Sequence, residues 1–164
     1  IISHCYIFLF TIFYFLVLRC TCNKIRQGEI LRDGETLISP KRKFVMGFFS
    51  PKGGSSNQRF LGIWYADVPL IDSVVWVANR DKPVYGKNGV FTVDKNGNLV
   101  VKKNVRGDLL WSTNNSIESK NCTGSLLDNG DFVIVDGNNR RLWHSFQHPT
   151  DTFLPEMRVY MDGI

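Results

Sequence analysis

A short β-strand unit that recurs along the chain constrains the fold more than any other feature of the sequence. Its clearest copy runs from Gly89 to Asn114, where apolar residues two positions apart alternate with other residues, as they do in strands. The pair Asn96-Gly97 tolerates positive φ, so it predicts a tight hairpin turn between the first two strands. A second turn at Val105–Asp108 leads into a third strand, Leu109–Thr113, which carries a tryptophan. The unit is therefore three short strands joined by hairpin turns.

A second copy of this unit follows the first. Leu99 and Phe132 occupy matching places 33 residues apart (132 − 99), and Trp111 and Trp143 are 32 residues apart (143 − 111). Repeats of this length indicate a repeated supersecondary unit that stacks or closes on itself.

A weaker copy lies upstream. We expect Phe44–Phe49 to take the place of the first return strand, which Leu99 begins in the clearest copy. Trp76 then matches Trp111, 35 residues later (111 − 76), and an extra aromatic strand at Phe60–Tyr65 fills a longer middle. No copy can bury its apolar face alone, so three copies predict a closed, pseudo-threefold, all-β body with one tryptophan of each copy in the core.

The composition agrees with one packed domain. The 164 residues are 43% hydrophobic and 13% aromatic, which is enough for a single core. The net charge of +5 is dispersed, with basic clusters at Lys41–Lys43 and Lys102-Lys103. Nucleic-acid binding needs a basic stripe interleaved with exposed aromatic residues. The aromatic residues here follow the repeat, so we assign them to the core and expect no nucleic-acid partner.

The first 22 residues differ from the rest. The apolar run Tyr6–Leu18 is shorter than the roughly 20 residues that a membrane span needs, and it suits the apolar region of a secretory signal peptide. We predict an N-terminally incomplete signal peptide at 1–22, with a retained membrane anchor as the alternative. The predicted domain then covers 25–148, and 149–164 form an extended arm leading into a downstream region. Any membrane attachment of the mature protein would come through that region.

Secretion makes two other features interpretable. Asn114 and Asn121 each begin an Asn-x-Ser/Thr tripeptide, so both are candidate N-glycosylation sites in the polar stretch between the last two copies. Cys5 and Cys20 would leave with the signal peptide, so Cys122 remains in the mature protein, together with Cys22 if cleavage falls before it. Two cysteines make no disulfide framework, so a Cys22–Cys122 bridge and a free Cys122 both stay open.

No catalytic or metal site is expected. His144 and His148 are four residues apart, which on a helix could hold a metal ion. Pro149 and the strand pattern place them in an extended segment, where residues four apart lie about 13 Å from each other. The sequence therefore predicts no enzyme activity, no metal and no cofactor for these 164 residues.

Four motifs together resemble a known family. RFLGIWY (Arg59–Tyr65), VVWVANRDKPV (Val74–Val84), LLDNGDFVIVD (Leu126–Asp136) and LWHSFQHPTDTFLP (Leu142–Pro155) resemble the bulb-type lectin domain of plant S-locus glycoproteins and G-type lectin S-receptor-like serine/threonine-protein kinases. The resemblance covers residues from about 25 to 160 and implies a type II β-prism. That fold has three four-stranded sheets around a pseudo-threefold axis.

The resemblance also implies where a sugar would bind. Mannose-binding members carry Gln-x-Asp-x-Asn-x-Val-x-Tyr in each copy, and alternate residues of a strand point to the same face. The clearest copy places Asp94, Asn96, Asn98, Val100 and Lys102 at those positions, so only Asn98 and Val100 match. The last copy places Leu127, Asn129, Asp131, Val133 and Val135 there, and the upstream copy Ser39, Lys41, Lys43, Val45 and Gly47.

The candidate carbohydrate-binding residues are therefore few. They are Asp94, Asn96, Asn98, Val100, Lys102, Asn129, Asp131 and Val133. Turn chemistry around the Asn-Gly pairs is the alternative role for the asparagines and for Asp131. The clearest copy keeps the most complete set, so its face is the best candidate.

Three functions remain in competition. The first is an extracellular carbohydrate-recognition module of a plant receptor-like kinase, with weakened mannose binding and the kinase domain elsewhere; no Gly-rich phosphate loop occurs in these residues. The second is a protein- or peptide-recognition surface that uses the loop Gly53–Gln58 and binds no sugar. The third is a secreted, stand-alone mannose lectin. All three place the domain in the secretory pathway, on the extracellular face of the plasma membrane or outside the cell, and leave homodimerisation open.

Overall fold

The computed structural model describes residues 22–69, 73–114, 118–152, 154 and 155. The predicted signal peptide and the end of the predicted arm lie outside these residues, apart from Cys22. The described chain forms β1 (Lys24–Arg26), β2 (Ile30–Arg32), β3 (Thr36–Ile38), β4 (Phe44–Phe49), β5 (Gln58–Tyr65), β6 (Val74–Val77), β7 (Val84–Tyr85), β8 (Val90–Val93), β9 (Leu99–Lys102), β10 (Leu109–Ser112), β11 (Thr123–Leu126), β12 (Phe132–Val135), β13 (Arg141–His144) and the short 3₁₀ helix η2 (Ser145–Gln147).

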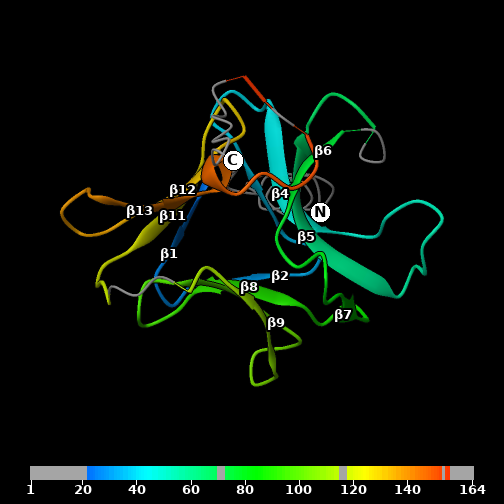
Figure 1. Ribbon diagram of the computed structural model, residues 1–164, viewed down its shortest axis with the longest axis horizontal. Helices are drawn as coiled ribbons and strands as arrows, with labels where there is room; N and C mark the ends of the chain where they lie inside the picture. Colours follow the sequence, from blue (N-terminus) through cyan, green and yellow to red (C-terminus); the bar gives the residue numbers. More distant parts are fainter. Residues whose placement is uncertain (1–21, 70–72, 115–117, 153, 156–164) are drawn as a thin grey trace, which may run out of the picture.

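The strands build three antiparallel sheets that face one another like the sides of a triangle (Figure 1). The first sheet has the order β3-β4-β5-β6, with β7 paired to Gln58 and Arg59 at the start of β5. The second sheet has the order β2-β8-β9-β10, and the third has the order β1-β11-β12-β13. This arrangement confirms the predicted all-β prism of three four-stranded sheets.

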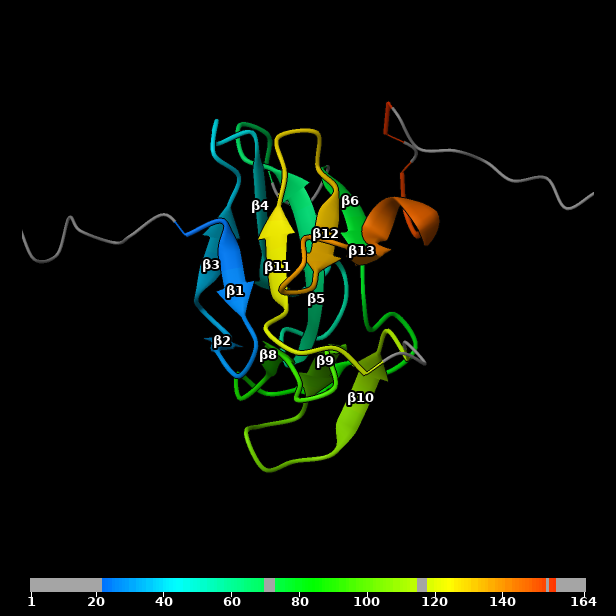
Figure 2. The same ribbon diagram turned by 90° about the vertical axis from the view of Figure 1, so that its left-hand side faces the viewer.

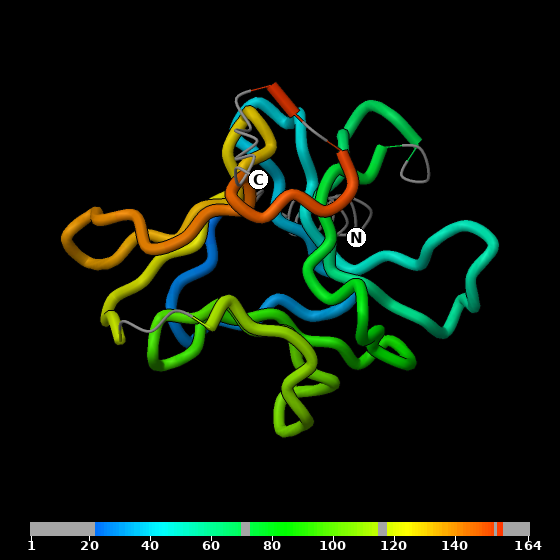
Figure 3. The backbone as a smooth tube through the Cα atoms, in the orientation of Figure 1, coloured from blue at the N-terminus to red at the C-terminus, as the bar shows by residue number. Residues whose placement is uncertain are grey.

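A single N-terminal segment supplies one edge strand to each sheet. Residues 24–38 form β1, β2 and β3, which pair with β11, β8 and β4 respectively. The tube in Figure 3 shows this segment, in blue, passing from one sheet to the next along the inside of the triangle. Figure 2 shows β1 beside β11, with β12 on the other side of β11, in the sheet that faces the viewer. We call residues 24–38 the belt.

The belt follows a six-residue pattern in the sequence. Ile25, Leu31 and Leu37 recur every six residues, and all three are buried. Between them Gly28 and Gly34 have φ of 85° and 99°, a left-handed conformation that favours glycine. In each turn a glutamate side chain accepts a hydrogen bond from the backbone N–H that opens the turn, at 2.7 and 2.8 Å. This pattern reads Arg-x-Gly-Glu twice, at Arg26–Glu29 and at Arg32–Glu35.

The predicted tryptophan core is present. The rings of Trp76, Trp111 and Trp143, one from the last strand of each sheet, pack edge to face with centroids 5.8 to 6.1 Å apart. Such pairs are preferred over face-to-face stacks because the positive ring edge meets the negative ring face. The contact among the three rings joins the three sheets at their last strands.

The chain after β13 covers the outer edge of β6. The Thr150 hydroxyl accepts a hydrogen bond from Val77 N–H at 2.8 Å, and Thr152 N–H donates to the Val75 carbonyl at 3.3 Å. The His148 carbonyl accepts a hydrogen bond from Trp76 Nε1, and the His148 ring stacks on Trp143 at 5.3 Å. Burial, and secondarily the nearby His144, lower the pKa of His148.

The two cysteines do not pair. Cys22 is exposed and Cys122 is buried, and both are free thiols. The ladder pairs Lys24 with Ser125 and Arg26 with Thr123, so the two cysteines lie at opposite ends of the β1–β11 pair. The open alternative of a Cys22–Cys122 bridge is therefore wrong. Burial, and then the charges of Asp136 and Asp94, raise the pKa of the Cys122 thiol. In the described part of the chain, no helix has the length and apolar character required to cross a bilayer.

A buried ion pair fixes the belt to the first sheet. The Arg59 guanidinium donates to both carboxylate oxygens of Asp33 at 2.7 and 2.6 Å, and also to the Phe48 carbonyl and the Ser50 hydroxyl. The side chains of Arg59 and Asp33 are 14% and 2% exposed. Such a pair is costly to break from one side, because the remaining charge stays buried without its partner.

We expect Asp33→Ala to lower the free energy of unfolding by about 3–5 kcal/mol, since it leaves the Arg59 charge uncompensated. The measurement is urea denaturation followed by tryptophan fluorescence. The matched control is Arg26→Ala in the preceding belt turn, whose ion pair with Glu29 is exposed and should contribute less than about 1 kcal/mol. Equal destabilisation by the two variants would contradict the role assigned to Asp33.

Candidate functional site

The third strands of the sheets, β5, β9 and β12, occupy equivalent places. In each of them one backbone N–H donates to a side-chain oxygen that follows the tryptophan strand: Leu61 N–H to Asn79 Oδ1, Leu99 N–H to Thr113 Oγ1, and Phe132 N–H to Ser145 Oγ. These bonds measure 2.8, 3.1 and 2.9 Å. The pseudo-threefold relation therefore extends to individual hydrogen bonds.

The ladder register gives the same correspondence. Val100 pairs with Thr92 and Ser112, and Val133 pairs with Ser125 and His144. In the first sheet the equivalent residue is Gly62, which pairs with Gly47 on the second strand and with Val77 on the tryptophan strand.

This register corrects the alignment expected for the upstream copy. The strand Phe44–Phe49 was predicted to match β9, with Val45 in the place of Val100, but it forms the second strand of its sheet. The supposed extra strand Phe60–Tyr65 is the true equivalent, so Gln58, Phe60, Gly62 and Trp64 replace Lys41, Lys43, Val45 and Gly47 at the motif positions. The turn between β3 and β4 has a hydrogen-bond pattern similar to that of the turns before β9 and β12, with Arg42 at φ 57° where those turns have Gly97 and Gly130.

The outer face of the second sheet carries the best-preserved motif. Leu99 and Val101 point into the core and are fully buried, so the alternate residues Asn98, Val100 and Lys102 lie on the opposite face. On that face Asn98 is 8% and Val100 3% exposed, and Lys102 is half-buried. Asn98 Oδ1 accepts a hydrogen bond from the Thr113 hydroxyl at 3.0 Å, which orients the amide on this face.

The turn before β9 holds the remaining candidates. Asp94 Oδ1 accepts the backbone N–H groups of Asn96 and Asn98, each at 2.9 Å. Gly97, with φ of 83°, completes the predicted hairpin turn. Asp94 therefore has a structural role in the turn in addition to any role in binding. The turn-chemistry alternative was stated for the asparagines and Asp131 and did not include Asp94.

On the third sheet the equivalent groups are engaged within the protein. Asp131 Oδ1 accepts the Ser145 hydroxyl at 2.9 Å and Phe146 N–H at 3.1 Å, while Oδ2 lies 2.9 Å from His144 Nδ1. Asn129 Oδ1 accepts Asp131 N–H in the turn. Val133 keeps its motif position on this face and is buried. The Asp131 carboxylate thus anchors the end of β13 to the start of β12.

On the first sheet the last three motif positions carry no polar side chain that could bond a sugar through an amide, a carboxylate or a phenol. Phe60 stands where Asn98 stands, Gly62 replaces Val100, and Trp64 replaces Lys102. This difference went unpredicted, although aromatic residues alternating along 60–64 were a signal in the sequence for an outward-facing apolar strip.

The two glycosylation candidates lie on the surface. Asn114 and Asn121 are exposed, and both adopt a left-handed conformation, with φ of 50° and 56°. Asn114 follows β10 and Asn121 precedes β11, so the two candidates bracket the connection between the second and third sheets.

Comparison with solved structures places this architecture among the prism lectins. The fold is similar to a structure described as a monomeric monocot mannose-binding lectin from Gastrodia elata, with a TM-score of 0.55, 19% identity, and coverage of 75% of this chain and 96% of that one. It is also similar to a lectin of Marasmius oreades, with a TM-score of 0.57, 15% identity, and coverage of 76% and 90%. At these identities the likeness shows the fold alone.

Sequence comparisons give the family. The model of the D-mannose binding lectin family matches residues 73–164. The G-type lectin S-receptor-like serine/threonine-protein kinase B120 of Arabidopsis thaliana is 44% identical over 94% of this chain and 18% of its own length. The receptor-like serine/threonine-protein kinase SD1-7 of the same plant is 38% identical over 97% of this chain and 19% of its own length. The chain thus spans less than a fifth of these two relatives.

The family model agrees with the prism fold and with the matched register of β5, β9 and β12. The chain therefore belongs to the D-mannose binding lectin family, as a bulb-type lectin domain homologous to the lectin region of plant G-type lectin S-receptor-like kinases.

Proposed function

We propose that this domain is an extracellular carbohydrate-recognition module that binds mannose-type glycans weakly, through the outer face of the second sheet. One observation carries the proposal: among three equivalent strands, β9 alone presents both an amide, Asn98, and a valine, Val100, at the register of the sugar-binding motif. The amide can bond a sugar hydroxyl, while the valine can pack against the apolar carbons of the ring.

The binding should be weak because the rest of the motif has changed. Lys102 stands in the place of the tyrosine, and Asp94 stands in the place of the glutamine and also binds two backbone N–H groups of its turn. A net hydrogen bond contributes about 0.5–1.5 kcal/mol, so losing two or three of them lowers affinity strongly. The third sheet should contribute little, since both oxygens of Asp131 are already bound.

The cellular setting follows from the relatives. The chain matches less than a fifth of each of two receptor-like kinases, so kinase activity would belong to other parts of a longer protein. The apolar run near the N-terminus and the two exposed asparagines are consistent with passage through the secretory pathway. We therefore infer an extracellular location, with membrane attachment through a region beyond these residues.

Lys102→Tyr restores one motif residue on the second sheet, and we expect it to tighten mannose binding about 3- to 10-fold, the equivalent of one added hydrogen bond. The measurement is a titration of the chain with methyl α-mannoside by calorimetry or NMR. Val135→Tyr makes the same change at the equivalent place of the third sheet and should leave the affinity unchanged. Asn98→Ala should abolish saturable binding.

Circular dichroism of each variant shows whether it folds, because Asn98 also accepts a bond from Thr113. If neither the original chain nor Lys102→Tyr binds mannose at tens of millimolar while folded, the sugar proposal fails. The peptide-recognition function considered above would then replace it.

For the chain expressed behind a complete secretion signal in plant cells, we expect two N-glycans, one each on Asn114 and Asn121. Intact mass before and after peptide N-glycosidase measures them. Asn121→Gln and Thr123→Ala should each remove the same glycan, because the acceptor tripeptide needs both residues. A secreted protein of unmodified mass would contradict the proposed sites.

A further inference from the structure

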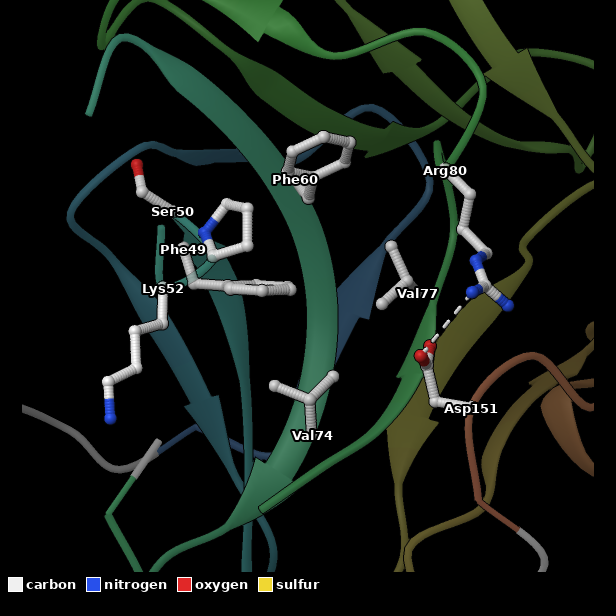
Figure 4. A pocket seen from close by; sticks show the side chains of 9 residues that line it. Phe49, Ser50, Lys52, Phe60, Val74, Val77, Arg80 and Asp151 are labelled. Carbon is white, nitrogen blue, oxygen red and sulfur yellow. Dashed lines mark ion pairs between the residues drawn. The ribbon is translucent and has the colours of Figure 1, made fainter. Parts of the chain in front are cut away.

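The outer face of the first sheet holds an apolar pocket where the other two sheets carry the polar motif. The cavity has a volume of about 420 Å³. Its walls are made by residues from β4, β5 and β6, the loop after β4 and the tail that covers β6, namely Phe49, Ser50, Pro51, Lys52, Phe60, Val74, Val77, Arg80 and Asp151. Figure 4 shows the Phe49 ring between Phe60 and Val74, with Val77 on the side toward Arg80.

Glycine at position 62 makes this pocket possible. A Cβ atom at Gly62 would lie 2.6 Å from Phe49 Cε1 and 2.8 Å from the Trp76 carbonyl oxygen, so a valine like those of the other two sheets cannot occupy this place. The Phe49 ring lies across β5 instead. Its ring centroid lies 6.1 Å from that of Phe60, which also lines the pocket, and 6.3 Å from that of Trp64, which does not.

The rim of the pocket is charged. Lys52 and Arg80 lie on opposite sides of it, and Arg80 forms an ion pair with Asp151 at 3.6 Å (Figure 4). Arg80 also donates to the Thr150 carbonyl, so the tail orients its guanidinium. Within the described residues Lys52 forms no ion pair, and it is exposed. The rim therefore has one cation in excess of its single carboxylate.

We propose that this pocket binds a small aromatic carboxylate, a molecule with one or two planar rings and one anionic group. Ligand pockets commonly measure about 300–1,000 Å³ and combine apolar walls with a few polar groups, and this cavity has both properties. The rings of Phe49 and Phe60 offer edge-to-face contacts to a planar ring. The excess cation at the rim complements the carboxylate.

This inference goes beyond the proposed glycan binding, because it concerns a different sheet and a different class of ligand. The two can fail independently. The outer faces of the first and second sheets have equivalent ladder positions, but the side chains at those positions are aromatic on the first sheet and polar on the second.

The test is a calorimetric titration of the chain with 3-phenylpropionate, its neutral amide 3-phenylpropionamide, and propionate. We expect saturable binding of 3-phenylpropionate, binding of the amide about fivefold weaker, and no binding of propionate, since the ring carries most of the contact. Phe60→Asn installs the residue of the second sheet and should weaken 3-phenylpropionate by about tenfold or more, while mannose binding stays unchanged.

Charge reversal gives a second arm that does not disturb the core. Lys52→Glu should weaken 3-phenylpropionate severalfold and leave the amide unchanged, and the matched control Lys103→Glu, an exposed lysine after β9, should change neither. Absence of 3-phenylpropionate binding to the folded chain would overturn the proposal. Tighter binding of a Phe-containing peptide capped at both ends would also overturn it, in favour of a peptide-docking surface.

Discussion

Backbone hydrogen bonding at the sheet edges is the constraint on which this fold depends. Each repeat supplies only three strands, so its sheet would leave the N–H and C=O groups of one edge unpaired, and such edges promote association with other chains. The belt pairs with all three edges in fifteen residues, through β1, β2 and β3. Because the same segment crosses all three sheets, none of them can separate without breaking hydrogen bonds to it.

The belt and the tryptophan core act together. The buried aliphatic residues of the belt lie every six positions, while the three tryptophans meet at the last strand of each sheet. The buried Asp33–Arg59 pair ties one belt turn to β5, and the tail after β13 covers the remaining edge of β6. The inner faces of the strands are constrained by close packing, where changes in volume are costly.

The outer faces of the three sheets differ in the side chains that they carry. At one and the same register position the second sheet has Asn98, the third has Asp131 and the first has Phe60. Asn98 lies at the proposed sugar site, Asp131 anchors its own neighbouring strand, and Phe60 helps to form an apolar pocket. A symmetric scaffold thus carries three chemically different surfaces, and only one of them keeps the features of a mannose site.

The sequence by itself determined the repeat, the hairpin turns at Gly97 and Gly130, the tryptophan of each copy and the sugar-type residues of β9, because each of these is a local pattern of spacing and turn chemistry. The tertiary structure alone decided which strand of the upstream copy is equivalent to β9, since hairpin turns look alike wherever they stand in a sheet. It also decided that the Asp131 carboxylate is bonded to His144, Ser145 and Phe146, and that the Phe49 ring crosses Gly62 and lines a pocket. These outcomes depend on contacts between strands, and sequence spacing within one strand carries no information about its neighbour across the sheet.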